Sequence, residues 1–150
     1  MKLRMVDRIC AYEPGRSIQG IKTVSFEEYS LRTALGLDAS LPETLLLESL
    51  FQLGNWLVIL SSDFTQMGLM IRTGRIDFVG PVRPGQRIAA SIFVRRYRKD
   101  GVCFDGEASV GDRIVARGTS CLAVAVPLAD YCDPDDVRVV FSEIHRPGEG

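Results

Sequence analysis

The segment from Leu45 to Leu60 is apolar at almost every position, and it constrains the fold more than any other part of the chain. Glu48, Gln52 and Asn55 interrupt it, so it falls short of the ~18 clean apolar residues that a membrane span needs. A helix that is apolar on nearly every side must be buried on nearly every side. We therefore predict a core helix and no membrane span. Its apolar residues are Leu45, Leu46, Leu47, Leu50, Phe51, Leu53, Trp56, Leu57, Val58, Ile59 and Leu60.

The residues just before this segment predict where the helix begins. Ser40 and Glu43 have the spacing of a capping box, in which two side chains satisfy backbone N–H groups of the first turn. Pro42 suits the first turn because its missing N–H would have no partner there. We therefore predict a helix with Ser40 as its N-cap that runs to about Ser61.

The rest of the chain as far as residue 126 carries strand patterns. The residues from Ile88 to Val94 alternate between apolar and other side chains, as in a strand with one buried face. Asp100-Gly101 predicts a hairpin turn behind that strand. Residues 27–32 are predicted to form a short helix and residues 33–41 a loop. Further strands are predicted over residues 5–12, 17–25, 67–79, 102–110 and 113–126.

One long helix among antiparallel strands predicts an α+β fold in which the sheet wraps around the helix. We assign residues 1–127 to this domain. Residues 128–150 contain Pro134 and Pro147, and we interpret them as a C-terminal extension with a short element near 135–144 and a loose end. One sheet covers only part of so apolar a helix. We therefore expect a homo-oligomer, either a dimer or a dimer of dimers.

Charge and cysteine content exclude several classes of function. The net charge is −1, from 18 basic and 19 acidic residues, which argues against a nucleic-acid binder. The four cysteines have no paired spacing and the chain has one histidine, His145, so we expect no zinc site, no other metal and no cofactor. Free, buried thiols and no apolar leader after Met1 favour a reducing cytoplasm.

The predicted helix has one polar stripe, which is the best candidate for a site. Thr44, Glu48, Gln52 and Asn55 fall within ~80° of one another at about 100° per residue. They could form a polar seam against water or a second subunit. Alternatively, Glu48 is a working carboxylate in a site lined by Gln52 and Asn55, because a carboxylate in so apolar a helix is costly unless it is hydrogen-bonded or useful.

Two weaker features accompany this stripe. The backbone N–H groups at the start of the helix could hold a carbonyl oxygen that gains negative charge, although every helix has such an end. The cluster Arg95-Arg96-Tyr97-Arg98-Lys99 lies beside the predicted Asp100-Gly101 turn. It is either a solvated turn or a landing site for phosphates or for an acidic carrier protein.

Four motifs in the right order resemble the β-hydroxyacyl-[acyl-carrier-protein] dehydratases of fatty acid biosynthesis. They lie within residues 5–126. The motifs are Val6-Asp7-Arg8-Ile9, then Glu13-Pro14-Gly15 with Ile21-Lys22, then Pro42 with Leu45-Leu46-Leu47-Glu48-Ser49-Leu50, and finally Phe78 with Pro81-Val82-Arg83-Pro84-Gly85. The resemblance implies a hotdog fold, usually dimeric, with sites for acyl thioesters on acyl carrier protein or coenzyme A at the subunit interface.

The resemblance also implies a pair of catalytic side chains. In that family a His moves the proton at C2 of the substrate, and a Glu on the central helix of the other subunit handles the C3 hydroxyl. Glu48 matches the Glu, whereas counting back without gaps places Ala34 at the His. Asp38 and Tyr29 are the nearby side chains that could stand in. The expected substrate-binding residues are Ala34, Glu43, Thr44, Gln52, Asn55 and Phe78.

The missing His leaves three hypotheses. The chain binds an acyl thioester but has lost or altered its dehydratase catalysis. It is an active enzyme built on Glu48, either an acyl thioesterase or a dehydratase with a substitute base. Or it is the non-catalytic subunit of a heterodimeric dehydratase whose other chain supplies the His. The residues alone do not decide whether the chain is an enzyme.

Overall fold

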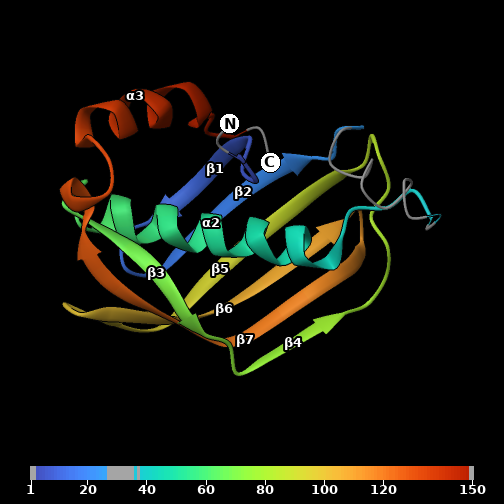
Figure 1. Ribbon diagram of the computed structural model, residues 1–150, viewed down its shortest axis with the longest axis horizontal. Coiled ribbons are helices and arrows are strands. Elements are labelled where there is room, and N and C mark those ends of the chain that lie inside the picture. The colour runs from blue at the N-terminus through green and yellow to red at the C-terminus, as the bar shows by residue number, and fades with distance from the viewer. Residues whose placement is uncertain (1–2, 27–35, 37, 149–150) are drawn as a thin grey trace.

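The computed structural model describes residues 3–26, 36 and 38–148. One antiparallel sheet has the strand order β1-β2-β5-β6-β7-β3, and β4 also pairs with β7. Figure 1 shows helix α2 lying across this sheet, as the sequence predicted. The elements are β1 Arg8–Glu13, β2 Ser17–Thr23, α2 Glu43–Ser61, β3 Gln66–Arg72, β4 Arg75–Phe78, β5 Arg87–Arg98, β6 Gly101–Val110, β7 Arg113–Pro127, the 3₁₀ turn η1 Leu128–Asp130 and α3 Pro134–Ile144.

The buried face of α2 forms the centre of the core. Leu46, Leu50, Leu53 and Leu57 recur at the spacing of one helix face, and each is at most 3% exposed. They pack with apolar residues of the inner sheet face such as Phe104. The length and composition of α2 would also suit a membrane span. Its burial against the sheet is what a core helix shows.

The capping-box prediction is wrong. The helix begins at Glu43 with Pro42 as its N-cap, and no side chain caps it. The Ser40 hydroxyl instead donates to the Asp38 carbonyl at 3.5 Å. The Leu41 amide donates to the Val82 carbonyl at 2.7 Å, which ties this segment to the residues before β5. That long-range contact holds the chain extended where the local pattern predicts the first turn.

The single strand predicted over residues 67–79 is also wrong, because β3 and β4 are separated at Thr73-Gly74. The Gly74 amide donates to the carbonyls of both Thr119 and Ser120, each at 3.1 Å. Ser120 has a φ of +53°, so β7 is distorted at this point. A Cβ on Gly74 would lie 2.9 Å from the Ser120 Cβ. The break between β3 and β4 therefore lies where β7 is distorted at Ser120.

The other strands and the C-terminal element agree with the predictions, and α3 covers the region expected near 135–144. The end of this helix is tied to the sheet, since the Arg146 amide donates to the Ile9 carbonyl at 3.0 Å. The predicted helix over 27–32 lies outside the described residues. Of the four free cysteines, Cys10 and Cys121 are buried as expected, whereas Cys103 and Cys132 are partly exposed. The division at residue 127 stays a prediction.

Candidate functional site

Three residues of the polar stripe line one cavity of about 410 Å³ beside α2. They are Glu48, Gln52 and Asn55, and Trp56 and Ile59 continue the same wall. The opposite walls come from Leu3 and Arg4, from Met67 of β3, and from the segment that includes α3. Glu48, Gln52 and Asn55 lie together because residues three and four apart in sequence share a helix face.

Gln52 holds the Glu48 carboxylate in place. Its side-chain Nε2 donates to Glu48 Oε1 at 2.9 Å and to the Leu3 carbonyl at 3.1 Å. Its Oε1 accepts from the Met5 amide at 2.8 Å. Within the described part of the chain, the Glu48 carboxylate makes no other hydrogen bond or ion pair. One carboxylate oxygen is therefore oriented by the protein, and the other is left for a ligand or water.

Asn55 has a structural contact of its own. Its Oδ1 accepts from the Gly68 amide at 2.8 Å and ties the start of β3 to the middle of α2. Val58 of α2 packs closely against Gly68, since a Cβ on Gly68 would lie 3.2 Å from the Val58 Cγ2. Asn55 thus lines the cavity and also fixes the strand beside it.

The structure does not bring the remaining predicted site residues to this cavity. Glu43 and Thr44 are exposed at the start of α2, and neither lines it. Phe78 is 42% exposed at the end of β4 and does not line it either. Ala34 lies outside the described residues. Only the part of the stripe that starts at Glu48 therefore faces the cavity.

The wall that the C-terminal segment contributes was not predicted from the sequence. The i, i+3, i+4, i+7 spacing of Asp133, Asp136, Val137 and Val140 is the signal that could have indicated a helix face. Nothing local predicts where that face docks. From this segment the cavity is lined by Leu128, Cys132, Asp133, Asp136, Val137 and Val140.

The charged groups of the cavity are mostly acidic. Among the described lining residues, Glu48, Asp133 and Asp136 are acidic and Arg4 is basic. The only histidine, His145, lies instead at the end of α3, stacked on Phe141 with ring centroids 4.8 Å apart. Among the described residues no cluster of His, Cys, Asp or Glu side chains could hold a metal ion. The chemistry available from the described lining is that of three carboxylates, one guanidinium and the Cys132 thiol.

The basic cluster lies elsewhere, on the sheet. Arg95, Arg96 and Arg98 line a second, open hollow of about 570 Å³ over β5, β6 and β7. The Arg95 guanidinium pairs with Asp105 at 2.7 Å, which neutralises part of the cluster. Its role as a solvated turn or as a landing site for an anionic partner stays a prediction.

Comparisons with known proteins identify the family. The model of the FabA-like domain matches residues 1–119. The chain is 35% identical over 116 residues to the 3-hydroxyacyl-[acyl-carrier-protein] dehydratase FabZ of Caulobacter vibrioides, which covers 75% of this chain and 73% of that protein. It is 31% identical over 123 residues to FabZ of Oleidesulfovibrio alaskensis, with 80% of each chain covered.

Solved structures show the same fold at lower identity. A hot-dog-like protein from Thermanaerovibrio acidaminovorans has a TM-score of 0.64 at 18% identity, over 86% of this chain and 91% of that one. The fluoroacetyl-CoA thioesterase FlK has a TM-score of 0.68 at 10% identity, over 86% and 97%. The hotdog expectation is confirmed by these likenesses and by the sheet around α2. The chain therefore belongs to the FabA-like domain family and has the hotdog fold.

Proposed function

We propose that this chain binds an acyl thioester in the cavity beside α2, and that its dehydratase chemistry is lost or altered. The relatives named FabZ are 3-hydroxyacyl-[acyl-carrier-protein] dehydratases, which supports a thioester on a carrier protein or coenzyme A as the ligand. The observation that carries the proposal is the Glu48 carboxylate, held by Gln52 at 2.9 Å on a cavity whose other lining residues are mostly apolar. A few polar groups on an apolar pocket are typical of small-molecule sites.

The altered chemistry follows from the missing histidine. The family resemblance implies a His that moves the C2 proton, and Ala34 stands at that position in this sequence. General acid–base help of this kind contributes roughly 10²–10⁴-fold in rate. Of the two substitutes, Asp38 is exposed and does not line the cavity, and Tyr29 lies outside the described residues.

The direct test measures binding and turnover of the wild-type chain together. Native mass spectrometry with crotonyl and 3-hydroxyacyl thioesters, on carrier protein and on coenzyme A, is expected to show bound ligand. Hydration of the crotonyl thioester is expected to be at least about 100-fold slower than for a FabZ dehydratase in the same assay. Hydration within about tenfold of that enzyme would contradict the loss of catalysis and direct attention to Asp38 and Tyr29.

A second candidate function is acyl thioester hydrolysis. It is favoured by the carboxylate that faces the cavity with no histidine among the described lining residues. A structural neighbour, the thioesterase FlK, shares the fold. Release of free thiol from an acyl thioester, without hydration of a crotonyl thioester, would distinguish this activity from a dehydratase with a substitute base.

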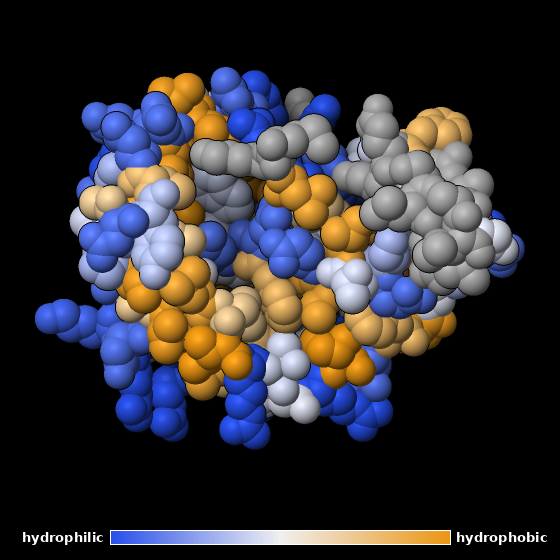
Figure 2. All heavy atoms as spheres, in the orientation of Figure 1, coloured by the Kyte–Doolittle hydropathy of each residue, from blue (hydrophilic) through white to orange (hydrophobic). Residues whose placement is uncertain are grey.

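We also propose that the working unit is an oligomer. Strand β3 is an edge of the sheet, pairing only with β7 within the described residues, and Ile71 at its end is 56% exposed. Figure 2 shows apolar side chains open to solvent over α2 and β3. Open strand edges and apolar patches are surfaces that a second copy or a related chain covers.

Light scattering tests this assembly. We expect a mass of at least twice the 16.6 kDa of one chain at micromolar concentration. A species of 16.6 kDa alone would count against a homodimer. A second hotdog chain that co-purifies and restores hydration would instead support the heterodimer hypothesis. A role in fatty acid biosynthesis in the cytoplasm belongs to the same proposal and is supported by the FabZ relatives.

A further inference from the structure

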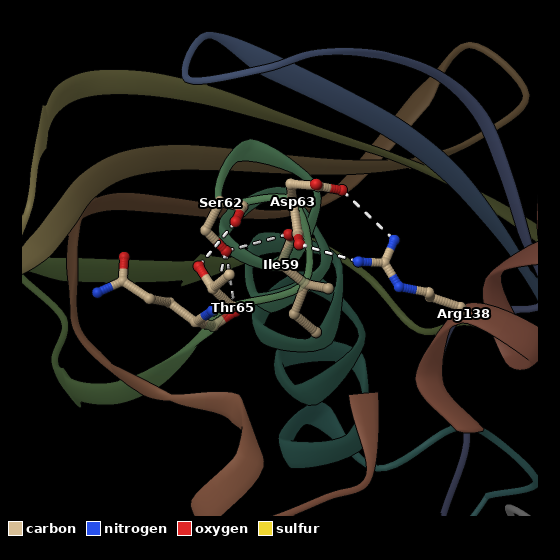
Figure 3. A network of polar contacts seen from close by, with 6 residues as sticks. Ile59, Ser62, Asp63, Thr65 and Arg138 are labelled. Carbon is tan, nitrogen blue, oxygen red and sulfur yellow. Dashed lines mark hydrogen bonds and ion pairs between the residues drawn. The ribbon is translucent and has the colours of Figure 1, made fainter. Parts of the chain in front are cut away.

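Helix α3 is fixed to the C-terminal end of α2 by aromatic and charged contacts. The Phe141 ring lies 6.0 Å from the Trp56 ring and 5.9 Å from the Phe64 ring, measured between centroids. The Arg138 guanidinium lies 4.2 Å from the Phe64 centroid, a cation–π distance. It also donates to the Asp63 carbonyl at 3.2 Å and to Asp63 Oδ1 at 3.4 Å (Figure 3). These contacts hold one face of α3 in a defined position.

A neighbouring face of the same helix is turned to the Glu48 cavity. Asp133, Asp136, Val137 and Val140 follow the i, i+3, i+4, i+7 spacing and all line it. Asp133 also caps the helix, accepting from the Asp135 amide at 2.9 Å. Because the contacts of Phe141 and Arg138 fix α3, this stripe has a defined position on the cavity.

The cavity has a direction along α2. From Glu48 to Ile59 it follows the helix for about 16 Å at 1.5 Å per residue. If the thioester of the proposed function lies beside Glu48, an acyl chain held in this cavity extends toward Ile59. Leu128, Val137 and Met67 line the cavity and belong to the same apolar cluster as Ile59. The match to the FabA-like domain ends at residue 119, so the wall formed by α3 comes from chain outside the matched region.

We propose that α3 sets the chain-length specificity of the acyl site, where Val137 and Val140 limit the length of an uncharged acyl chain. This inference rests on the proposed function. The carboxylates of Asp133 and Asp136 add a charge preference, because an acyl chain that ends in a carboxylate would face like charges at this wall. The ligand class is thus an apolar acyl group on a pantetheine thiol.

Alkyl-pantetheine thioethers, from butyl to dodecyl, test the length limit because they bind without reacting. Val137→Ala with Val140→Ala widens the wall, and Val139→Ala is the matched control, since Val139 is 59% exposed on the same helix and does not line the cavity. Room for two more methylenes corresponds to about tenfold tighter binding of the longest chains, at ~0.8 kcal/mol for each buried methylene. The control is expected to keep the wild-type length profile.

The outcomes separate this inference from the function on which it rests. If the wild-type chain binds no thioether of any length, the proposed function fails and the inference with it. If the wild-type chain binds, but the double variant and Val139→Ala have the same length profile, the acyl site stands and the role of α3 is overturned. A thioether that ends in a carboxylate is expected to bind more weakly than its uncharged counterpart. Equal binding would overturn the charge preference.

A second measurement uses the wild-type chain, so it does not depend on a variant that folds. Cys132 lines the cavity, whereas Cys103 lines the hollow on the sheet. Burial raises the pKa of the Cys121 thiol to about 11, so it reacts slowly with iodoacetamide at about pH 8. Octyl-pantetheine thioether is expected to slow alkylation of Cys132 in proportion to its occupancy and to leave Cys103 unchanged. If the ligand binds and Cys132 is not protected from alkylation, the proposal that the α3 segment lines the acyl site is overturned.

Discussion

Glu48→Gln is expected to leave the chain folded and to remove whatever turnover of acyl thioesters the wild-type chain supports, by roughly 10²–10⁴-fold. Glutamine keeps the shape of the side chain, and its amide oxygen can still accept from Gln52 Nε2, which lies 2.9 Å from Glu48 Oε1. What it loses is the charge and the titratable proton that acid–base chemistry needs. Thioester turnover, melting temperature and dimer affinity are the three measurements.

Glu107→Gln is the matched control for this variant. Glu107 pairs with Arg117 at 2.8 Å in the β6–β7 pair and does not line the cavity. Its loss is expected to change neither turnover nor, beyond ~1 kcal/mol, stability. If Glu48→Gln instead weakened the assembly and left turnover unchanged, Glu48 would be a structural residue that holds a partner charge. A buried charge left unpaired is strongly destabilising.

Phe104→Ala is expected to lower the free energy of unfolding by about 3–5 kcal/mol, the cost of removing a large aromatic side chain from a packed core. Phe104 is 1% exposed on β6 and lies directly beneath α2. Phe93→Ala is the control, because Phe93 on β5 is 53% exposed, and it is expected to cost much less. Urea unfolding of the two variants gives the comparison. Similar losses for both would contradict the placement of Phe104 at the helix–sheet contact.

The contact between α2 and Phe104 can also be tested at Gly54, where the effect of an alanine on stability is expected to change sign when the Phe104 ring is removed. A Cβ on Gly54 would lie 2.6 Å from the Phe104 Cζ, so Gly54→Ala is expected to destabilise the wild-type chain by about 1–3 kcal/mol through overpacking. In the Phe104→Ala background the ring is gone. The same change is then expected to stabilise by about 1 kcal/mol, because alanine favours a helix over glycine. An equal effect in both backgrounds would show that the two residues do not meet.

Strands β5 and β6 and the end of α2 were predictable because their signals are local. The alternation from Ile88 to Val94 and the Asp100-Gly101 turn lie within the residues they describe, and β5, β6 and the turn between them are where these patterns indicate. The start of α2 and the break at Gly74 were not predictable in this way. They depend on Val82 and on Ser120, which the chain brings close only when it folds.

In the candidate site, too, some features were predictable from local sequence and others depended on tertiary contacts. The helical period places Glu48, Gln52 and Asn55 on one face from sequence alone, whatever the rest of the chain does. Their catalytic and binding roles stay predictions. That α3 lines the cavity was decided by tertiary contacts between Phe141 and Trp56 and between Arg138 and Asp63. Periodicity says which side chains share a face, but packing free energy between distant segments decides what that face meets.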